Sequence, residues 1–295
     1  MTETADAPSE AAANLPAWSE CFRPEVRAAL RQARPFTSLA DRSWLDSTGT
    51  GMVVAIVDSG VEGDHPAVGG KLVRSVRVEL DGEAANIIDD DPIDVVGHGT
   101  ACAGIIHALV PDADLISVRV LGHNNTAKGM AFAHGLDWVI QERIPIANLS
   151  LSSRSDDLFA IFHDLVDQAY FANTLLVCAA SNHPGQSSYP SLFSSVISVA
   201  AHDVPDRLAW FYNPRPPVEF GAWGVDVPVP WRGGSTITGT GNSFATPHIA
   251  GLVARIRATY PAATPFEVKA LLAAGAADPA VRPDPAARIA SPATG

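Results

Sequence analysis

The stretch VVAIVDSGV, residues 53–61, decides how this chain can fold. It opens with five apolar residues, four of them β-branched, as expected of a strand that is buried on both faces of a sheet. Similar short runs follow at 115–121, 146–151, 174–180 and 195–201. Helical stretches separate these runs at 103–109, 127–142 and 157–172, and two more follow at 243–260 and 265–275. Strands that alternate with helices predict an α/β fold with a mostly parallel sheet and helices on both faces.

Asp58 and His98 are the first polar residues that this pattern places at functional positions. Asp58 directly follows the first strand, at the carboxyl edge of the sheet, where α/β proteins bind ligands. His98 lies between Gly97 and Gly99 and precedes a helix of small residues, so its imidazole is unobstructed. Taken alone, Asp58 serves equally well as a turn cap, and a lone histidine is more often structural than catalytic.

Asn182 and Ser243 lie at comparable positions farther along the chain. Asn182 follows another apolar run in VCAASNHPG (177–185), where its amide can donate a hydrogen bond, although a plain turn asparagine is the simpler interpretation. Ser243 begins a helix in GTGNSFATPHIAG (239–251). A serine there is usually a cap, but the unpaired amides of a first helical turn also stabilise a developing oxyanion.

The order of these residues is more specific than any one of them. Acid, base and nucleophile come as Asp58, His98 and Ser243, the order in subtilisin, whereas α/β-hydrolases have the nucleophile first. The hydrolase order fails because His248 follows Ser243 with no acid between them. A dinucleotide-binding loop is disfavoured, because the glycines of 239–241 follow no strand with an acid about 20 residues on.

Five stretches in this order resemble the motifs of the subtilisin-like serine proteases, or subtilases: AIVDSGV (55–61), GHGTACAG (97–104), NLSLSS (148–153), AASNHPG (179–185) and GNSFATPHIAG (241–251). The resemblance implies a three-layer subtilisin-like fold and a serine endopeptidase. By that resemblance Ser243 is the nucleophile, His98 the general base and Asp58 the residue that orients His98. Asn182 and the backbone N–H of Ser243 would form the oxyanion hole.

The resemblance also implies where the substrate binds. Ser150, Leu151 and Ser152 match the strand that pairs with an extended substrate, and Ala180 and Ser181 match a wall of the first specificity pocket. The family pattern has glycine where this chain has Ser152 and Ser181. Side chains at those two positions should narrow the pocket, so we expect a preference for small residues before the cut.

Two further positions, Asn242 and Asp94, matter for the comparison with the family. Asn242 stands where the family usually has threonine before the nucleophile. Asp94 closes the acidic run DDDPID (89–94) and, by the resemblance, borders the pocket next to the scissile bond. A basic substrate residue is the functional expectation for Asp94, and a solvated charged surface is the alternative.

No cofactor or metal is expected from the sequence. Subtilisins often carry a calcium-binding loop after the histidine helix, but here IIHAL (105–109) runs directly into VPDADL (110–115), so the strong calcium site is expected to be missing. A weaker calcium site elsewhere stays open. Cys102 lies one helical turn after His98 and resembles the free cysteine of the thiol-sensitive proteinase K-like branch, with a packing role.

Composition limits the partners. The formal net charge of −12 argues against nucleic acid and leaves polypeptides as the expected substrates. No apolar run is long enough to span a bilayer. Cys21, Cys102 and Cys178 form no disulfide framework, and the acidic N-terminus lacks the features of a signal peptide, so a cytoplasmic location is expected, with a secreted mature form as the alternative. The sequence does not decide the oligomeric state.

We expect a partly disordered N-terminal extension over residues 1–45, a catalytic domain over 46–277 and a flexible Pro/Ala-rich tail over 278–295. Maturation of a peptide precursor, against general protein turnover, is the more specific expectation for the biological role. A catalytically silent subtilase fold that binds peptides is the rival from another functional class.

Overall fold

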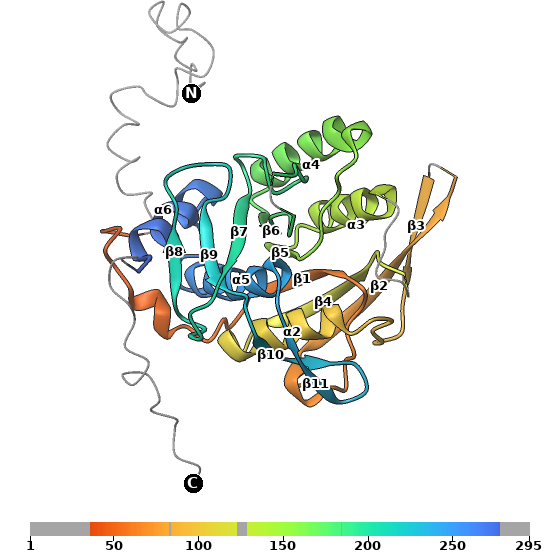
Figure 1. The fold of residues 1–295 in the computed structure, drawn as a ribbon, viewed down its shortest axis with the longest axis horizontal. Coiled ribbons are helices and arrows are strands. Elements are labelled where there is room, and N and C mark those ends of the chain that lie inside the picture. Colours follow the sequence, from red (N-terminus) through yellow and green to blue (C-terminus); the bar gives the residue numbers. More distant parts are fainter. Residues whose placement is uncertain (1–35, 83, 123–128, 184, 278–295) are drawn as a thin grey trace, which may run out of the picture. The chain divides into compact units, whose positions relative to one another are not determined.

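The structure is a computed structural model that describes residues 36–82, 84–122, 129–183 and 185–277. Contacts divide the chain into two units, and the second unit begins at Ser38. The central feature of this second unit is a nine-stranded sheet in the order β3-β2-β4-β1-β5-β6-β7-β9-β8 (Figure 1). The strands are β1 (Val53–Asp58), β2 (Leu72–Asp81), β3 (Ala84–Asp89), β4 (Asp114–Arg119), β5 (Ile146–Leu149), β6 (Leu175–Ala179), β7 (Ile197–His202), β8 (Trp210–Tyr212) and β9 (Phe220–Trp223).

The sheet is mostly parallel. The seven inner strands, in the sheet order β2-β4-β1-β5-β6-β7-β9, pair in parallel. Only the two outermost strands, β3 and β8, pair antiparallel with their neighbours. A separate antiparallel hairpin is formed by β10 (Val227–Trp231) and β11 (Ser235–Gly239). The α/β class expected from the alternating pattern is therefore confirmed.

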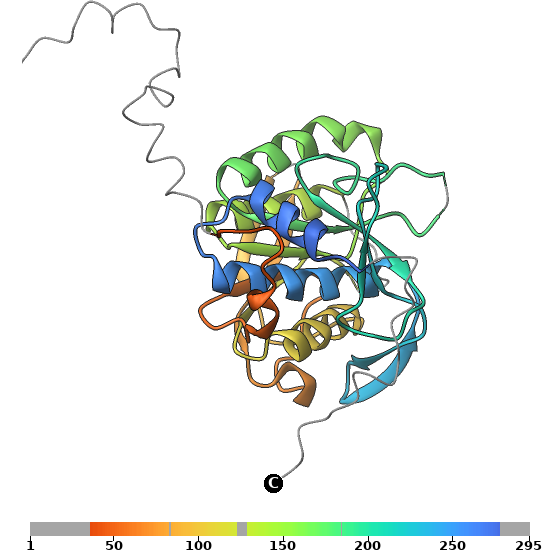
Figure 2. The ribbon, with the colours of Figure 1, turned by 90° about the vertical axis from the view of Figure 1, so that its left-hand side faces the viewer.

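Helices cover both faces of the sheet, which makes three layers (Figures 1 and 2). Two helices, α3 (Gly129–Gln141) and α4 (Phe159–Phe171), pack on one face, and α2 (His98–Leu109) and α5 (Asn242–Thr259) pack on the other. The last helix, α6 (Pro265–Gly275), contacts α5. Single-turn 3-10 helices lie at Ser43–Asp46, Pro66–Val68 and Asp156–Leu158.

The core lies in the two spaces between the sheet and its helices. Along β1 the side chains alternate between them: Ala55 and Val57 join the cluster under α3 and α4, while Val54 and Ile56 are equally inaccessible to solvent. All of β1 after Val53 is buried, which explains why its sequence is a continuous apolar run.

Candidate active site

The candidate site lies at the carboxyl edge of the central strands. Asp58 is the last residue of β1, and Asn182 follows the end of β6. The two helices on the face of the sheet away from α3 and α4 begin at this edge: α2 begins with His98, and α5 begins with Asn242 and Ser243. Parallel strands bring their carboxyl ends to one side, so four residues that are far apart in sequence meet in one place.

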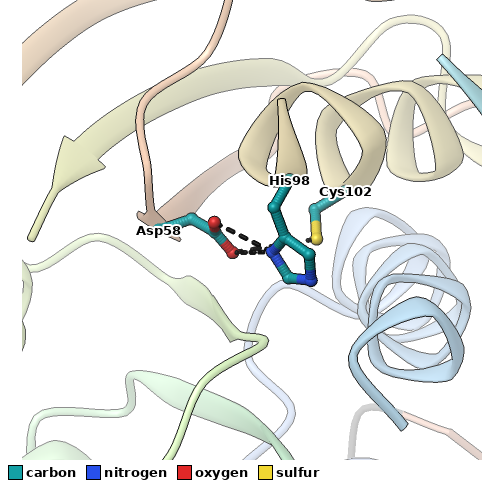
Figure 3. A group of neighbouring side chains, drawn as sticks. All are labelled: Asp58, His98 and Cys102. Carbon is teal, nitrogen blue, oxygen red and sulfur yellow. Dashed lines mark hydrogen bonds and ion pairs between the residues drawn. The ribbon is translucent and has the colours of Figure 1, made fainter. Parts of the chain in front are cut away.

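Asp58 and His98 form a tight buried pair. The Nδ1 atom of His98 lies 2.9 Å from both carboxylate oxygens of Asp58 (Figure 3). Asp58 is fully buried, and its Oδ1 also accepts a 2.7 Å hydrogen bond from the backbone N–H of Ser59. A carboxylate only accepts, so Nδ1 carries the proton and Nε2 of the neutral ring is a base. In Figure 3 Nε2 points away from Asp58.

The environment of His98 favours its charged form. Burial works against protonation of the imidazole, but the charge of Asp58, the hydrogen bond to it and the charge of Asp94 outweigh burial. The pKa of His98 therefore lies above its usual value. An imidazole in this setting accepts a proton readily and is stabilised once it has done so.

Two glycines allow α2 to begin against β1. Gly97, the N-cap, has φ of 118°, a conformation that other residues rarely adopt. A Cβ atom at Gly99 would lie 2.0 Å from the carbonyl oxygen of Gly60, so the helix start packs directly on the turn after Asp58. These contacts place His98 beside Asp58.

Asp94 is held by hydrogen bonds within the protein. Asp94 is 8% exposed and is absent from the lining of the cleft that holds His98 and Ser243. Its Oδ1 accepts from Ser59 Oγ and from two backbone N–H groups, and its Oδ2 accepts from both the N–H and the hydroxyl of Thr100. Both carboxylate oxygens of Asp94 thus accept hydrogen bonds from the protein and stabilise the turn before His98. The expected preference for a basic substrate residue near Asp94 stays a prediction.

Ser243 is the second residue of α5 and is not its cap. The N-cap is Gly241, and no side chain caps this helix. The carbonyl oxygen of Ser243 accepts a 2.8 Å hydrogen bond from Ser150 Oγ and a longer one, 3.8 Å, from the thiol of Cys102. Two side chains from other segments thus hold the backbone of Ser243, and Ser243 lines the cleft together with His98.

Asn182 lines the same cleft. Its Oδ1 accepts a 2.8 Å hydrogen bond from the backbone N–H of Asn242, which fixes the orientation of the amide. Its Nδ2 has no hydrogen-bond partner within the part of the chain that the structure describes. The amide therefore presents N–H donors close to the start of α5, where the first-turn backbone N–H groups also lie.

The cleft itself has a volume of about 620 Å³. It contains every sequence-predicted site residue except Asp58, which lies behind His98, and Asp94. The other substrate residues expected from the resemblance line it: Ser150, Leu151, Ser152, Ala180 and Ser181. The cleft also contains residues that sequence reasoning missed: Leu121, Gly129, Phe132, Ser153, Arg154, Ala179 and His183. Ser153, Ala179 and His183 lie within the quoted motifs and Arg154 directly follows one, so their place in these motifs was the available signal.

Cys102 is adjacent to the pair but is not suited to chemistry. Its thiol lies 3.9 Å from Asp58 Oδ2 (Figure 3). Burial, followed by the charge of Asp58, raises the pKa of this thiol well above its usual value. Asp58, His98 and Cys102 are the one group in the described ranges with metal-ligand spacing. A protonated thiol is a poor metal ligand, and one carboxylate is far from the oxygen cage that calcium requires.

Within the described ranges, none of the helices is both long and apolar enough to cross a membrane.

Known proteins carry the same arrangement of sequence and fold. Residues 49–287 match the peptidase S8 domain of the subtilase family. The minor extracellular protease Epr of Bacillus subtilis is 32% identical over 75% of this chain, which spans 34% of the length of Epr. The intracellular serine protease of Paenibacillus polymyxa is 30% identical over 72% of this chain and 69% of that protein.

A solved structure agrees with the sequence matches. The crystal structure of a cold adapted subtilisin-like serine proteinase superposes with a TM-score of 0.63 at 27% identity, covering 79% of this chain and 85% of the other. Sequence and fold thus point to the same family over most of the chain. The chain belongs to the subtilase family.

Proposed function

We propose that this protein is a serine endopeptidase that hydrolyses peptide bonds with Asp58, His98 and Ser243 as its catalytic triad. The observation that carries the proposal is the buried Asp58–His98 pair, with His98 lining the same cleft as Ser243 and Asn182. Family membership supports the reaction class.

The first half of the reaction forms an acyl-enzyme. His98 Nε2 takes the proton of the Ser243 hydroxyl while Oγ attacks the carbonyl carbon of the scissile bond. The carbonyl oxygen becomes an oxyanion, which accepts hydrogen bonds from Asn182 Nδ2 and the backbone N–H of Ser243. The imidazolium, stabilised by Asp58, then gives its proton to the leaving amine as the C–N bond breaks.

The second half repeats these steps with water. His98 takes a proton from a water molecule, whose oxygen attacks the acyl carbon. The same donors hold the second oxyanion, and the imidazolium returns the proton to Ser243 Oγ as the ester bond breaks. The carboxylic acid product leaves, and the triad is restored with its protons balanced.

The substrate is proposed to be a polypeptide that lies extended along Ser150, Leu151 and Ser152. Ser152 and Ser181 add side chains on both sides of the first pocket, so we propose that the residue before the cut is small. A restricted pocket suits maturation of a peptide precursor at few sites better than general turnover. Mass spectrometry of cleavage products distinguishes the two: cuts at one or two positions support maturation, and dispersed cuts contradict it.

Neither catalysis nor folding is proposed to need a metal. The four residues 110–113 connect α2 to β4, which leaves little chain for a calcium loop. Supporting this, the donor set at the triad suits hydrogen bonding rather than calcium. Chelation with EGTA should leave both the rate and the midpoint of thermal unfolding unchanged, and a clear fall in either would contradict the proposal.

The compartment is a further proposal. We place the protein in the cytoplasm, because Cys102 and Cys178 are buried free thiols, as is usual in a reducing compartment. Cell fractionation with an antibody against the chain tests this. Recovery of the protein from the culture medium would overturn it.

An active-site fluorophosphonate tests the proposed chemistry directly, because it reacts only with an activated serine. We expect the native protein to be labelled at Ser243 and the Ser243→Ala variant to be unlabelled, with cleavage of casein in the first and not the second. A folded native protein that binds peptides but takes no label would support the peptide-binding rival instead.

A further inference from the structure

Asn242, the residue before Ser243, makes side-chain hydrogen bonds to segments outside its own helix. Helix formation does not require these bonds. Its Oδ1 accepts a 2.8 Å hydrogen bond from the N–H of Ala201, at the end of β7. Its Nδ2 donates to the carbonyl oxygens of Ala180, at 3.1 Å, and Ser181, at 2.9 Å. The amide side chain therefore uses its acceptor and both donor directions on backbone groups outside its own helix.

The backbone of the same residue completes the arrangement. The N–H of Asn242 donates to Asn182 Oδ1 at 2.8 Å. Asn242 thus holds the two residues that precede Asn182 through their carbonyls, and holds the Asn182 amide through its oxygen. The position and the orientation of Asn182 are both set by one residue, which is itself the neighbour of Ser243.

We propose that Asn242 is the positioning residue of the oxyanion hole. The inference rests on the proposed peptidase function and adds to it how the two donors are kept in register. One donor is on Asn182 and the other is the backbone N–H of Ser243, and Asn242 bonds directly to both segments. A donor that is misplaced by a fraction of an ångström stabilises the oxyanion less. Fixing the relative positions of the two donors should therefore raise kcat.

A hydroxyl side chain cannot do the same. Serine or threonine has one O–H donor, so it can reach at most one of the two carbonyls that Asn242 bonds. Aspartate keeps the shape and the acceptor for Ala201 but would turn an oxygen toward two carbonyl oxygens. These differences give a graded series of variants at a single position.

The first experiment compares kcat and KM of Asn242→Ala, Asn242→Thr and Asn242→Asp on one peptide substrate. We expect kcat of Asn242→Ala to fall about tenfold to a hundredfold with little change in KM, since losing a whole oxyanion donor costs about 10²–10³-fold. Asn242→Thr should lie between Ala and the native protein, and Asn242→Asp should be the slowest of the three. A rise in KM with unchanged kcat would overturn the proposal.

The matched control is Asn213. Its side chain makes the same pattern, with Nδ2 donating to the carbonyls of Arg215 and Val218 and Oδ1 accepting from the N–H of Arg215, but it follows the edge strand β8 and is not in the cleft. Asn213→Ala should lower the midpoint of thermal unfolding without changing kcat. An equal loss of kcat in both asparagine variants would show that general loosening is the cause and would overturn the inference.

A double-mutant cycle with Asn182→Ala separates positioning from general structural support. If Asn242 acts through Asn182, Asn242→Ala should lower kcat much less in the Asn182→Ala background than in the native protein. Additive losses in the cycle would contradict the proposal. If Asn242→Ala does not yield folded protein, Asn242→Ser is measured in the same cycle with the same criterion.

The outcomes also separate this inference from the proposed function. Fluorophosphonate labelling of Ser243 and turnover by the native protein decide whether the chain is a serine peptidase. Unchanged kcat in the Asn242 series would then reject only the positioning role. Absence of labelling and of turnover in the native protein would reject both.

Discussion

His98 is subject to opposing influences that together set the working pH of the site. Burial disfavours its imidazolium form, whereas Asp58 and Asp94 favour it more strongly, so its pKa is raised. The general base must be neutral to accept the proton of Ser243. A raised pKa therefore moves the onset of activity to higher pH, and activity is lost as pH falls through that pKa.

The pH dependence of kcat/KM tests this directly. We expect kcat/KM of the native protein to rise through a single ionisation that lies above the usual histidine value. Asp58→Asn removes the charge that raises the pKa and should lower kcat by about 10⁴-fold, as loss of the orienting carboxylate does in a Ser-His-Asp triad. Its residual activity should titrate at lower pH. A profile that is flat between about pH 5 and pH 9 would contradict the assignment of His98.

Substrate preference is a second property that single residues decide. Ser152 and Ser181 both line the cleft, and the Ser181 hydroxyl accepts a hydrogen bond from the backbone N–H of His183. The double variant Ser152→Gly and Ser181→Gly should widen the first pocket. We expect its kcat/KM for a peptide with phenylalanine before the cut to rise at least about tenfold relative to alanine, the value of one or two extra buried methylenes.

The control for that experiment is the native protein on the same pair of peptides. It should cleave the alanine peptide faster than the phenylalanine peptide. Faster cleavage of phenylalanine by the native protein would show that the two serines do not narrow the pocket.

The sequence located most of the site residues but could not predict their side-chain contacts. Order and motif placed Asp58, His98, Asn182 and Ser243 at one edge of the sheet, where the structure has them. The hydrogen bonds of Asp94 could not be predicted, because a motif fixes the position of a residue along the chain but not the direction of its side chain. Four of its hydrogen bonds come from residues that follow it within six positions, and such local saturation is visible only in three dimensions.

At the scale of elements, strands with buried residues were predicted from the sequence more reliably than exposed strands. The five central strands were found because each contains a run of buried apolar residues, and their ends fall within two residues of the expected bounds. The hairpin of β2 and β3 was missed, since most of its residues are partly exposed and many are charged. The strand β10, VPVPW, was missed because two prolines disguise it as a loop.

Helix α6 is the element whose ends the sequence predicted best. It runs from Pro265 to Gly275, which is the range expected from the sequence, and Thr264 is its N-cap. The structure adds a capping box: the Thr264 hydroxyl accepts from the N–H of Glu267 at 3.3 Å, and Glu267 Oε2 accepts from the N–H of Thr264 at 2.8 Å. Reciprocal capping satisfies two backbone donors that the helix itself leaves unpaired.

Thr264→Ala should therefore lower the free energy of unfolding by about 1 kcal/mol, the usual cost of losing such a cap. Urea unfolding should be followed in the Ser243→Ala background, which prevents self-cleavage. Thr236→Ala, at an exposed position in β11, is the control and should cost less. If both variants are equally stable, the box contributes nothing to this helix.

At the scale of the whole molecule, α5 connects the site to the core. Most of its residues are buried, and it packs against α2, β5, β6, β7 and β9. Arg255, near its far end, donates to the carbonyl oxygens of Leu109, at the end of α2, and of Leu45. Gly251 lets the two helices approach, since a Cβ atom there would lie 2.7 Å from a Leu109 methyl carbon. The packing of α2 on α5 therefore sets how His98 and Ser243 face each other.

His248, in the middle of α5, links this packing to the pH dependence of stability. It is 1% exposed, its Nδ1 bonds the carbonyl of Phe244 at 3.0 Å, and its Nε2 has no partner among the described residues. Burial is the main cause that lowers its pKa to about 4, and the positive charges of Arg207 and His202 add to the shift. In the unfolded chain the same histidine titrates near its ordinary value of 6.5.

The sign of the effect follows from which state binds the proton. Between pH 6.5 and about pH 4 the unfolded chain is protonated at His248 and the folded protein is not, so stability falls as pH falls through that window. The difference between the pKa of His248 in the unfolded chain and in the folded protein corresponds to about 3 kcal/mol. The free energy of unfolding of the Ser243→Ala protein should therefore decrease substantially between pH 7.5 and pH 4.5. His248→Leu should remove much of this decrease, whereas His163→Leu, at an exposed position in α4, should not. An unchanged pH dependence in His248→Leu would show that other groups cause the acid sensitivity and that α5 tolerates a charge at its centre.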